Sequence, residues 1–288
     1  MNDQRPGTLY LCATPIGNLE DVTLRALRVL KEVDLIAAED TRQTQKLLQR
    51  YGIRTRLLSY HAHNQDRRAG EIWAALEAGK SVAVVSDAGL PGISDPGALL
   101  VAGAVERGIP LVVVPGASAP VTALVASGLR TDRFVFEGFL PRKGRKKLLE
   151  ELALERRTLV FFESPNRVLK TLEELREVFG ERRVAVAREL TKLHEEVFRG
   201  TLSAALEHFR ANPPRGEFTL VVEGNTAPAS GTVPSKADAA AEVERLVENG
   251  EERREAIRLA ARRLGMPKRE VYALVAGRER SGKNTETS

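Results

Sequence analysis

The chain has very few of the residues that build covalent or metal-based frameworks. Cys12 is its single cysteine, which excludes an internal disulfide and a zinc site made of several cysteines. Among its four histidines, His61 and His63 are neighbours, but no other metal-ligand residues cluster with them. We therefore expect no metal ion, and a reducing compartment, the cytoplasm.

Signals for secretion, membrane insertion and two familiar kinds of catalytic site are missing as well. No apolar signal-peptide core follows the first residues, and the uncharged segment 109–129 contains three prolines, which favours strand, turn and helix over a membrane span. The chain contains neither the Gly-x-Gly-x-x-Gly fingerprint of dinucleotide-binding proteins nor the Gly-x-Ser-x-Gly turn of serine hydrolases. A near match to a phosphate-binding loop at 277–284 lacks the required Ser or Thr, so we discard it.

What is present is the composition of an ordinary globular chain, with 42% hydrophobic and 29% charged residues and a net charge of +5. Strands are predicted at 8–13, 34–38, 56–59, 82–85 and 111–114, and then at 134–137, 158–162, 183–187 and 218–222, with helical patterns between them. This alternation predicts two α/β domains, 1–116 and 117–226, of which the first has a parallel sheet covered on both faces. A Pro/Ser/Thr-rich linker then leads to a small helix-turn-helix-like α domain at 234–277 and a tail, 278–288, that we expect to be disordered.

The most informative stretch is the loop that follows the predicted strand 82–85. It contains three glycines, two prolines and the aspartates Asp87 and Asp95 within residues 86–97. Glycine lets backbone approach a ligand closely, proline stiffens a loop, and open α/β sheets bind ligands beyond the carboxyl ends of their strands. The loop therefore predicts a ligand site, the alternative being that both aspartates only form turns.

Polar residues also follow the other predicted strands, which suggests a site in a cleft between the two domains. Helix capping explains Thr41 and Ser118 in part, but it explains Arg42 poorly. The exits concerned are Thr14–Asn18, Glu39–Arg42, Pro115–Ser118, Glu163–Arg167 and Arg188–Lys192.

Two basic segments point to a polyanionic partner. The run 142–147 has five cations in six residues and follows a strand exit, although a solvated face explains it equally well. Apolar positions on both sides of Gly265 predict a helix-turn-helix with arginines recurring on one outer face. A packing or dimerisation cap is the alternative for this second segment.

Seven motifs, in this order along the chain, carry a family resemblance. They are Thr14–Asn18, Ala38–Arg42, Ser86–Gly97, Val114–Ser118, Gly138–Pro141, Glu163–Pro165 and Arg188–Lys192. Together they closely resemble the ribosomal RNA small-subunit methyltransferase I family, a branch of the tetrapyrrole-methylase-like fold, over about residues 7–276. The resemblance implies S-adenosylmethionine as methyl donor between two α/β domains, a homodimer, and 2′-O-methylation of a cytidine in the decoding region of 16S ribosomal RNA.

Carried over position by position, the resemblance also implies a donor pocket. The loop after the fourth strand should line it, residues near 15–17 should close one wall, and the second domain should supply the rest. The implied residues are Pro15, Gly17, Asp87, Ala88, Gly89, Leu90, Ile93, Ala117, Ser118, Pro165, Leu190 and Phe218. Because the sulfonium of the donor is itself cationic, no metal is needed to activate it.

The acceptor hydroxyl must lose its proton, and a carboxylate within hydrogen-bond reach is the usual base. We consider Asp40 and Glu39 as candidate bases, and Arg42 and Lys143 as groups that position phosphate or stabilise an oxyanion. A structural ion pair between Asp40 and Arg42 is the alternative, and Glu163 and Glu189 are reserve bases. The candidates for RNA contact are Arg142, Lys143, Arg145, Lys146, Arg254, Arg258, Arg262, Lys268 and Arg269.

Two other functions stay open from the sequence. A methylase of tetrapyrroles or another small molecule shares the fold, but it needs neither the basic run nor the C-terminal helical domain. A non-catalytic RNA-binding protein of ribosome assembly would not need an intact donor loop. Tight binding of S-adenosylmethionine and salt-dependent affinity for ribosomal subunits would discriminate among the three.

Overall fold

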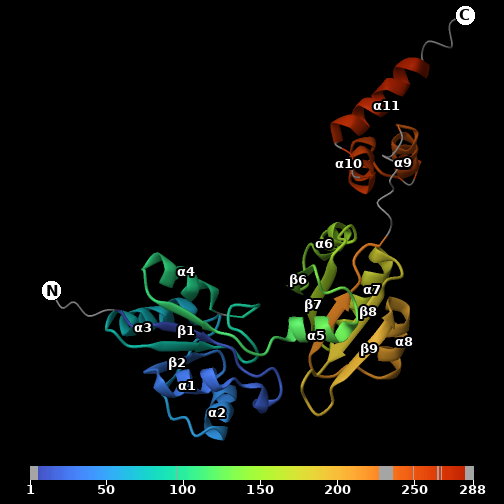
Figure 1. Ribbon diagram of the computed structural model, residues 1–288. Coiled ribbons are helices and arrows are strands. Elements are labelled where there is room, and N and C mark those ends of the chain that lie inside the picture. Colours follow the sequence, from blue (N-terminus) through green and yellow to red (C-terminus); the bar gives the residue numbers. More distant parts are fainter. Residues whose placement is uncertain are drawn as a thin grey trace, which may run out of the picture. The chain divides into compact units, whose positions relative to one another are not determined.

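The protein forms two compact units in the computed structural model, which describes residues 6–95, 97–226, 236–248, 250–264, 266 and 268–282. The first unit runs to Asn225 and contains two five-stranded sheets, and the described part of the second is helical (Figure 1). Within these described ranges, no helix is both long enough and apolar enough to span a membrane.

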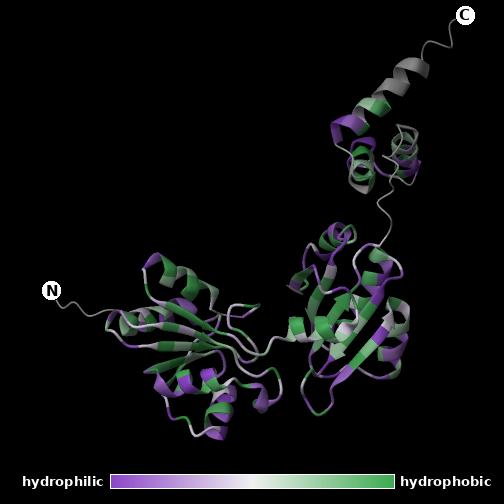
Figure 2. Cartoon of the chain, in the orientation of Figure 1, coloured by the Kyte–Doolittle hydropathy of each residue, from purple (hydrophilic) through white to green (hydrophobic). Residues whose placement is uncertain are grey.

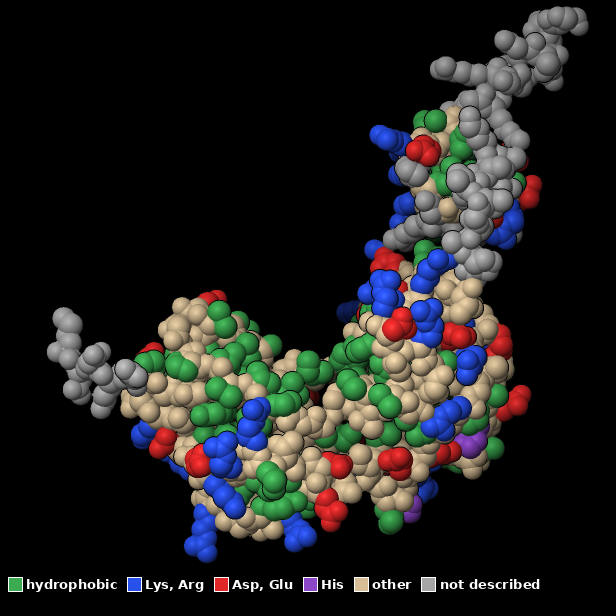
Figure 3. Space-filling model, viewed as in Figure 1, with side chains coloured by type: hydrophobic (Ala, Val, Ile, Leu, Met, Phe, Trp, Pro, Cys, Tyr) green, Lys and Arg blue, Asp and Glu red, His purple; other side chains and the backbone are tan. Residues whose placement is uncertain are grey.

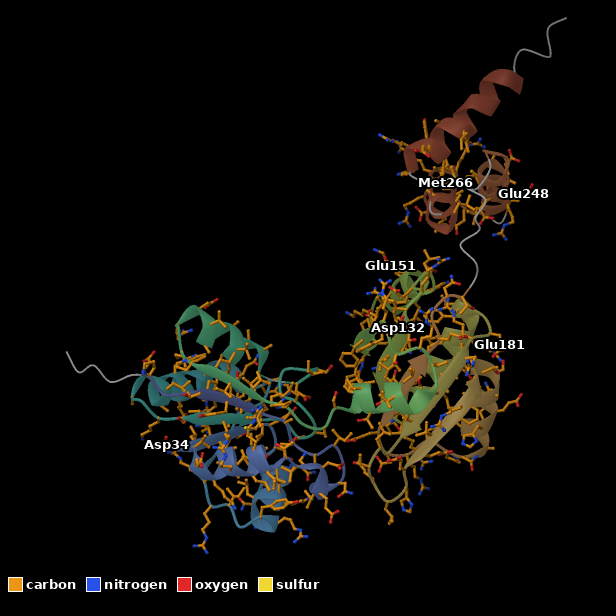
Figure 4. All side chains as sticks on the ribbon, in the orientation of Figure 1. Asp34, Asp132, Glu151, Glu181, Glu248 and Met266 are labelled. Carbon is orange, nitrogen blue, oxygen red and sulfur yellow. The ribbon has the colours of Figure 1, made fainter. Side chains whose placement is uncertain are left out.

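The first sheet is parallel throughout, as the alternating pattern predicts. Every pair of neighbouring strands runs in the same direction, so all five strands end at one edge. At the opposite edge, Asp34 (labelled in Figure 4) accepts a hydrogen bond from the backbone N–H of Ser81 at 2.8 Å, which joins two strand entries. The spatial order is β3 (Leu57–Ser59), β2 (Leu35–Ala38), β4 (Val82–Val85), β1 (Leu9–Cys12) and β5 (Leu111–Val114).

Helices cover both faces of this sheet, which explains why its central strands are apolar on both sides. On one face, α1 (Leu24–Glu32) and α2 (Thr41–Arg50) pack against the strands, with the short 3₁₀ helix η1 (Leu19–Asp21) before them. On the other face lie α3 (Gln65–Glu77) and α4 (Ala98–Glu106). Figure 2 shows hydrophobic strands in this sheet, with many hydrophilic residues in α1 and α2 and mostly hydrophobic residues in α4.

The second sheet is mixed, which the sequence does not predict. Only β6 and β7 are parallel, and the other three pairs are antiparallel. The unpredicted strand is β9, which returns from β8 through a short loop and therefore pairs with it as a hairpin. Its residues are mostly half-exposed, so no apolar run marks it. The order is β6 (Phe134–Phe139), β7 (Thr158–Glu163), β10 (Phe218–Val222), β8 (Arg183–Arg188) and β9 (Glu196–Thr201).

The two faces of the second sheet are covered differently. Helices α6 (Arg145–Leu152), α7 (Val168–Phe179) and α8 (Leu202–Ala211) form the larger core on one face. Helix α5 (Ala119–Ser127) alone packs on the other, against β7, β8 and β10. Since α5 follows β5 directly, the chain passes from the first sheet to the second in residues 115–118.

The described part of the second unit is a group of three helices around its own core. Residues of all three helices contribute to this core, and Met266, labelled in Figure 4, packs against it. The helices are α9 (Lys236–Glu248), α10 (Arg253–Leu264) and α11 (Lys268–Gly282). Helix α11 continues five residues into the predicted disordered tail, because the Arg and Glu residues there are good helix formers. Gly265 and residues 283–288 lie outside the described part of the chain.

Candidate active site

A cavity of about 620 Å³ lies at the carboxyl edge of the first sheet and is closed by residues of the second sheet. All six strand exits that the sequence singles out contribute to it, as expected for an α/β sheet whose ligand lies beyond the strand ends. The lining consists of Ile16, Glu39, Asp87–Leu90, Ile93–Asp95, Pro115–Pro120, Phe139, Phe162–Pro165, Ala187, Leu190 and Gly216–Thr219.

The loop that follows β4 is tied to the loop that follows β1. Thr14 N–H donates to the Gly89 carbonyl at 2.9 Å, Gly89 N–H donates to the Thr14 carbonyl at 3.1 Å, and the Thr14 hydroxyl donates to the Ser86 carbonyl at 3.0 Å. Gly89 has a φ of +83°, and a Cβ there would lie 3.6 Å from both Ile16 and Ala117. Glycine therefore permits this backbone conformation and leaves open the space between two lining residues.

The passage from β5 to α5 forms another wall. A Cβ on Gly116 would lie 2.9 Å from the Cβ of Ala13, so only glycine allows the strand exits to approach this closely. Ser118 is the N-cap residue of α5, but its side chain makes no capping hydrogen bond. Its hydroxyl is therefore not used by the helix, contrary to the capping interpretation, and it lies at the cavity.

A strained segment supplies part of the wall from the second sheet. Glu189 and Thr191 have φ values of +50° and +65°, which non-glycine residues rarely adopt, and Leu190 between them is buried against the cavity. Gly17 makes this packing possible, since a Cβ there would lie 2.8 Å from the Leu190 carbonyl oxygen. Lys192 binds Glu189 at 2.8 Å and so anchors the segment.

The charged residues that line the cavity are all acidic. Among the described lining residues there is no Lys or Arg, and the five carboxylates belong to Glu39, Asp87, Asp95, Glu163 and Glu217. A cavity of this composition has a negative potential and favours a positively charged ligand.

Two of the five carboxylates are neutralised by cations outside the cavity lining. The Glu163 side chain, which is fully buried, lies 3.6 Å from a guanidinium nitrogen of Arg145 and 3.4 Å from one of Arg167. Glu217 binds the ammonium of Lys192 at 3.0 Å. These two acids therefore belong to structural ion-pair networks of the second sheet.

The other three acids gather at the first sheet, and none of them forms a salt bridge within the described part of the chain. The Asp40 N–H donates to Asp87 at 2.9 Å, and the Asp87 N–H donates to Glu39 at 3.4 Å. Burial raises the pKa of Glu39. Burial, followed by the negative charge of Glu39, raises the pKa of Asp95 to about 6. The cavity thus contains carboxyl groups that accept protons more readily than ordinary surface acids do.

Relatives of this chain share its sequence over most of its length. Residues 8–206 match the tetrapyrrole (corrin/porphyrin) methylase family. The ribosomal RNA small subunit methyltransferase I of Synechocystis sp. is 50% identical over 279 residues, covering 96% of this chain and 100% of the relative. The protein of the same name from Thermotoga maritima is 52% identical over 219 residues, covering 76% and 99%. The chain belongs to the ribosomal RNA small subunit methyltransferase I family.

Solved structures agree with this assignment at the level of the fold. The uroporphyrin-III-C-methyltransferase of Thermus thermophilus matches with a TM-score of 0.56 at 25% identity, over 75% of this chain and 94% of that one. Diphthine synthase matches with a TM-score of 0.60 at 14% identity, over 76% and 91%, which shows the fold alone. The predicted α/β fold and the family resemblance are therefore confirmed.

In this member of the methyltransferase I family, most of the residues predicted to bind the donor lie at the cavity. Pro15 and Gly17 do not line it, but they flank Ile16, which does. The residues brought together are Asp87, Ala88, Gly89, Leu90, Ile93, Ala117, Ser118, Pro165, Leu190 and Phe218.

The candidate catalytic residues are separated by the fold. Glu39 lines the cavity, whereas Asp40, Arg42 and Lys143 do not. Asp40, rather than Thr41, caps α2 by accepting a hydrogen bond from the Arg42 N–H at 2.8 Å, and its carboxylate pairs with the Arg42 guanidinium at 3.2 Å. These hydrogen bonds hold the pKa of Asp40 below its usual range. Asp40 and Arg42 therefore form the structural ion pair that the sequence analysis considers as the alternative to a catalytic role.

The basic run after β6 contains both exposed and inward-facing cations. Arg142, Lys143 and Lys146 are exposed, as RNA contact requires. Arg145, in contrast, is only 12% exposed and pairs with Glu163 and Glu174. The interpretation of Arg145 as an RNA-binding residue is corrected accordingly, because as the first residue of α6 it faces β7 and α7.

The predicted RNA-contact residues of the second unit lie on α10 and α11. Arg254, Lys268 and Arg269 are exposed, and Arg258 is hydrogen-bonded to Glu255 in the preceding turn of α10. The side chain of Arg262 lies outside the described residues.

Sequence reasoning does not assign a role to several lining residues. Asp95 belongs to the loop that the sequence predicts as a ligand site, but no role is assigned to it, because its burial depends on the rest of the fold. Phe139 lies in the Gly138–Pro141 motif but receives no role from the sequence, and Glu217 has no local signal. They reach the cavity through the pairing of β10 and β6 with β7, which the sequence does not predict.

Proposed function

We propose that this protein transfers a methyl group from S-adenosylmethionine to the ribose 2′-hydroxyl of a cytidine in the decoding region of 16S ribosomal RNA. The observation that carries the proposal is the acidic cavity of about 620 Å³ at the strand ends of a methyltransferase I family member. The relatives' name supplies the small-subunit RNA as substrate, and the family resemblance supplies the 2′-hydroxyl of cytidine.

The cavity residues suit the methyl donor. Leu90 from the first sheet and Leu190 and Phe218 from the second provide apolar walls for a flat adenine ring. The unused hydroxyl of Ser118 can bind a polar part of the donor, and the unpaired carboxylates favour its positive charge. When bound, the donor supplies a methyl group attached to a cationic sulfur, which needs no metal ion for activation.

The contribution of the chain is to hold the reacting groups in a fixed geometry. The bonds between Thr14 and Gly89 and the packing of Gly17 on Leu190 fix opposite walls of the cavity. Correct orientation of two reactants can lower a reaction barrier by roughly 7–11 kcal/mol. A cavity carboxylate within reach of the hydroxyl would accept its proton.

The acceptor RNA requires a positively charged surface. We assign its phosphate contacts to the exposed Arg142, Lys143 and Lys146 beside β6, and to Lys268 and Arg269 on α11. Since ribosomal subunits are assembled in the cytoplasm, we place the activity there.

A small-molecule methylase is the second candidate, favoured by the matching tetrapyrrole methylase family and by the structural likeness to a uroporphyrin-III-C-methyltransferase.

The experiment that decides between the candidates is methyl transfer from labelled S-adenosylmethionine to small subunits from cells lacking this protein, followed by nucleoside analysis. We expect a 2′-O-methylated cytidine. Donor binding without transfer to subunits or free RNA would favour the small-molecule methylase, and no donor binding would favour a non-catalytic assembly protein.

We also propose that the protein acts as a homodimer through an apolar face of the first unit. Six large apolar side chains are exposed on β5, an edge strand, and on helices α4 and α5. Figure 3 shows hydrophobic side chains gathered in this region. Patches of this kind mark interaction surfaces, and an uncovered edge strand invites pairing with another chain. The residues are Leu99, Val105, Val112, Val113, Val121 and Val125.

A further inference from the structure

One carboxyl group of the cavity differs from the others in its contacts. Asp87 and Glu39 each accept a hydrogen bond from a backbone N–H, and Glu163 and Glu217 each pair with cations. Asp95 lines the same cavity, but its described neighbours are the hydroxyl of Ser86 and the two acids of the first sheet. It is therefore the cavity carboxylate least committed to holding the structure together.

The backbone around Asp95 is held in an unusual conformation. Ser94, directly before the aspartate, has a φ of +64°, which non-glycine residues rarely adopt, and Gly97 has a φ of +141°. A Cβ added to Gly138 in the bulge of β6 would lie 3.0 Å from the Ser94 hydroxyl, so glycine there lets the second sheet approach this loop. Strained residues that are held by their surroundings often mark functional sites. Here the strained loop fixes Asp95 at the cavity.

We propose that Asp95 is the general base that takes the proton of the acceptor hydroxyl during methyl transfer, an inference that rests on the proposed function. As the hydroxyl oxygen forms its bond to the methyl carbon, Asp95 accepts the hydroxyl proton, and the electron pair of the broken carbon–sulfur bond stays on the now neutral sulfur. The carboxyl then releases the proton to solvent, which restores the charge of Asp95. Atoms and charge balance without any further reactant.

The electrostatics of the loop support this role. Burial raises the pKa of Asp95 to about 6, with smaller contributions from the charges of Glu39 and Asp87 and an opposing hydrogen bond from Ser86. From the second sheet, the charged lining groups are Glu163 and Glu217, which are both paired with cations. At pH 8 Asp95 is ionised, yet it is a stronger base than an ordinary aspartate.

The sequence-based candidates fit the role less well. Asp40 lies outside the lining, and its pairing with Arg42 lowers its pKa and makes it a weaker base. Glu189 binds Lys192, and its pKa is also lowered. Of the sequence-based candidates, Glu39 remains as a competitor, since it lines the cavity and burial raises its pKa.

The test is single-turnover methyl transfer to small subunits as a function of pH, with the full-length wild type and four variants. For Asp95→Asn we expect a rate lower by about 10²–10⁴-fold at pH 8, with partial recovery in Asp95→Glu. The wild-type rate should rise tenfold per pH unit below pH 6 and level off above it, and Asp95→Asn should lack this rise. Glu39→Gln removes a lining carboxylate and should weaken donor binding, but at saturating donor it should keep the tenfold rise and shift it to lower pH. Asp132→Asn, an exposed aspartate outside the lining that pairs with Arg130, should behave as wild type.

Two further measurements make the outcome decisive. Calorimetry should show that Asp95→Asn lowers donor affinity far less than it lowers the rate, because Glu39 and Asp87 still favour the positive charge of the donor. Carbon NMR of labelled aspartate should detect a carboxyl that titrates near pH 6 in wild type only. If wild type methylates no ribose, the proposed function fails, and this inference fails with it. If wild type is active and Asp95→Asn retains its rate and pH dependence, or if Glu39→Gln abolishes both, only the assignment of Asp95 is overturned.

Discussion

Arg145 and Glu163 form an ion pair in the interior of the second sheet, 3.6 Å apart, with 12% and 0% of their side chains exposed. This ion pair places Arg145, a residue of the basic run, inside the protein and next to the cavity-lining Glu163. Thr171 links the two, since its hydroxyl binds Glu163 at 2.6 Å and accepts a hydrogen bond from Arg145 at 2.6 Å. The pair therefore supports the cavity wall rather than a surface that binds RNA.

Replacing Arg145 should weaken the fold. In Arg145→Met the buried carboxylate of Glu163 keeps only Arg167 as a charged partner, and breaking a buried pair costs about 3 kcal/mol of unfolding free energy. Urea unfolding measures the change. Lys146→Met, at an exposed neighbouring position, should stay within about 0.5 kcal/mol of wild type. Equal stability of the two variants would contradict the structural role of Arg145.

The exposed cations of the same run should act on RNA. Replacing Arg142, Lys143 and Lys146 together with Gln should weaken binding to small subunits and reduce the slope of log affinity against log salt by about 2–3, because three phosphate contacts are lost. Filter binding at several salt concentrations measures both effects. Donor affinity should be unchanged. An unchanged salt slope would show that the run 142–147 is an ordinary solvated surface and not an RNA-binding one.

Ser118 should affect ligand binding but not stability. Its side chain makes no capping hydrogen bond, so Ser118→Ala should leave the unfolding free energy within about 0.5 kcal/mol. It should lower donor affinity about five- to tenfold if the hydroxyl binds the donor. Thr23 is the matched control, since it caps α1 by accepting a bond from the Ala26 N–H at 3.0 Å. Thr23→Ala should cost about 1 kcal/mol without changing donor affinity.

Asp95 should make the protein less stable as the pH rises. Its pKa is about 6 in the folded state, above its ordinary value of 3.8, so the folded state favours the protonated form. The stability that protonation contributes is complete below pH 4 and is lost as the pH rises through 6. Asp95→Asn should therefore melt about 2 °C higher than wild type at pH 8 and at nearly the same temperature at pH 4. Calorimetric scans at both pH values test this, and a lower melting temperature at pH 8 would refute it.

The apolar face should control self-association. Val125 on α5 is 71% exposed, so Val125→Lys should shift the protein from dimer to monomer without a large loss of stability. Leu193→Lys is the control, since Leu193 is 93% exposed but lies in the loop between β8 and β9. Sedimentation equilibrium distinguishes the species, and a dimer that persists in Val125→Lys would locate the interface elsewhere.

The sequence predicts where the cavity lies better than it predicts the ion pairs and pKa values of the residues around it. The strand exits meet because parallel strands end at one edge, and glycines at 89 and 116 mark places where backbones approach, so both can be predicted from local patterns. The inward direction of Arg145 depends on how α6 packs against β7, and the high pKa of Asp95 depends on burial by distant segments. No local pattern contains that information. The sequence does not predict the mixed second sheet, because β9 is half-exposed and therefore shows no apolar run.

The bonds between Thr14 and Gly89 have a consequence for protein engineering. Since each residue donates to the other and the Thr14 hydroxyl also binds Ser86, the loops after β1 and β4 behave as one piece of structure. A chimera that takes only residues 86–97 from a relative would therefore replace the loop after β4 without the β1 loop that binds it. The two loops should therefore be grafted together, so that the hydrogen bonds that join them in the cavity wall are kept.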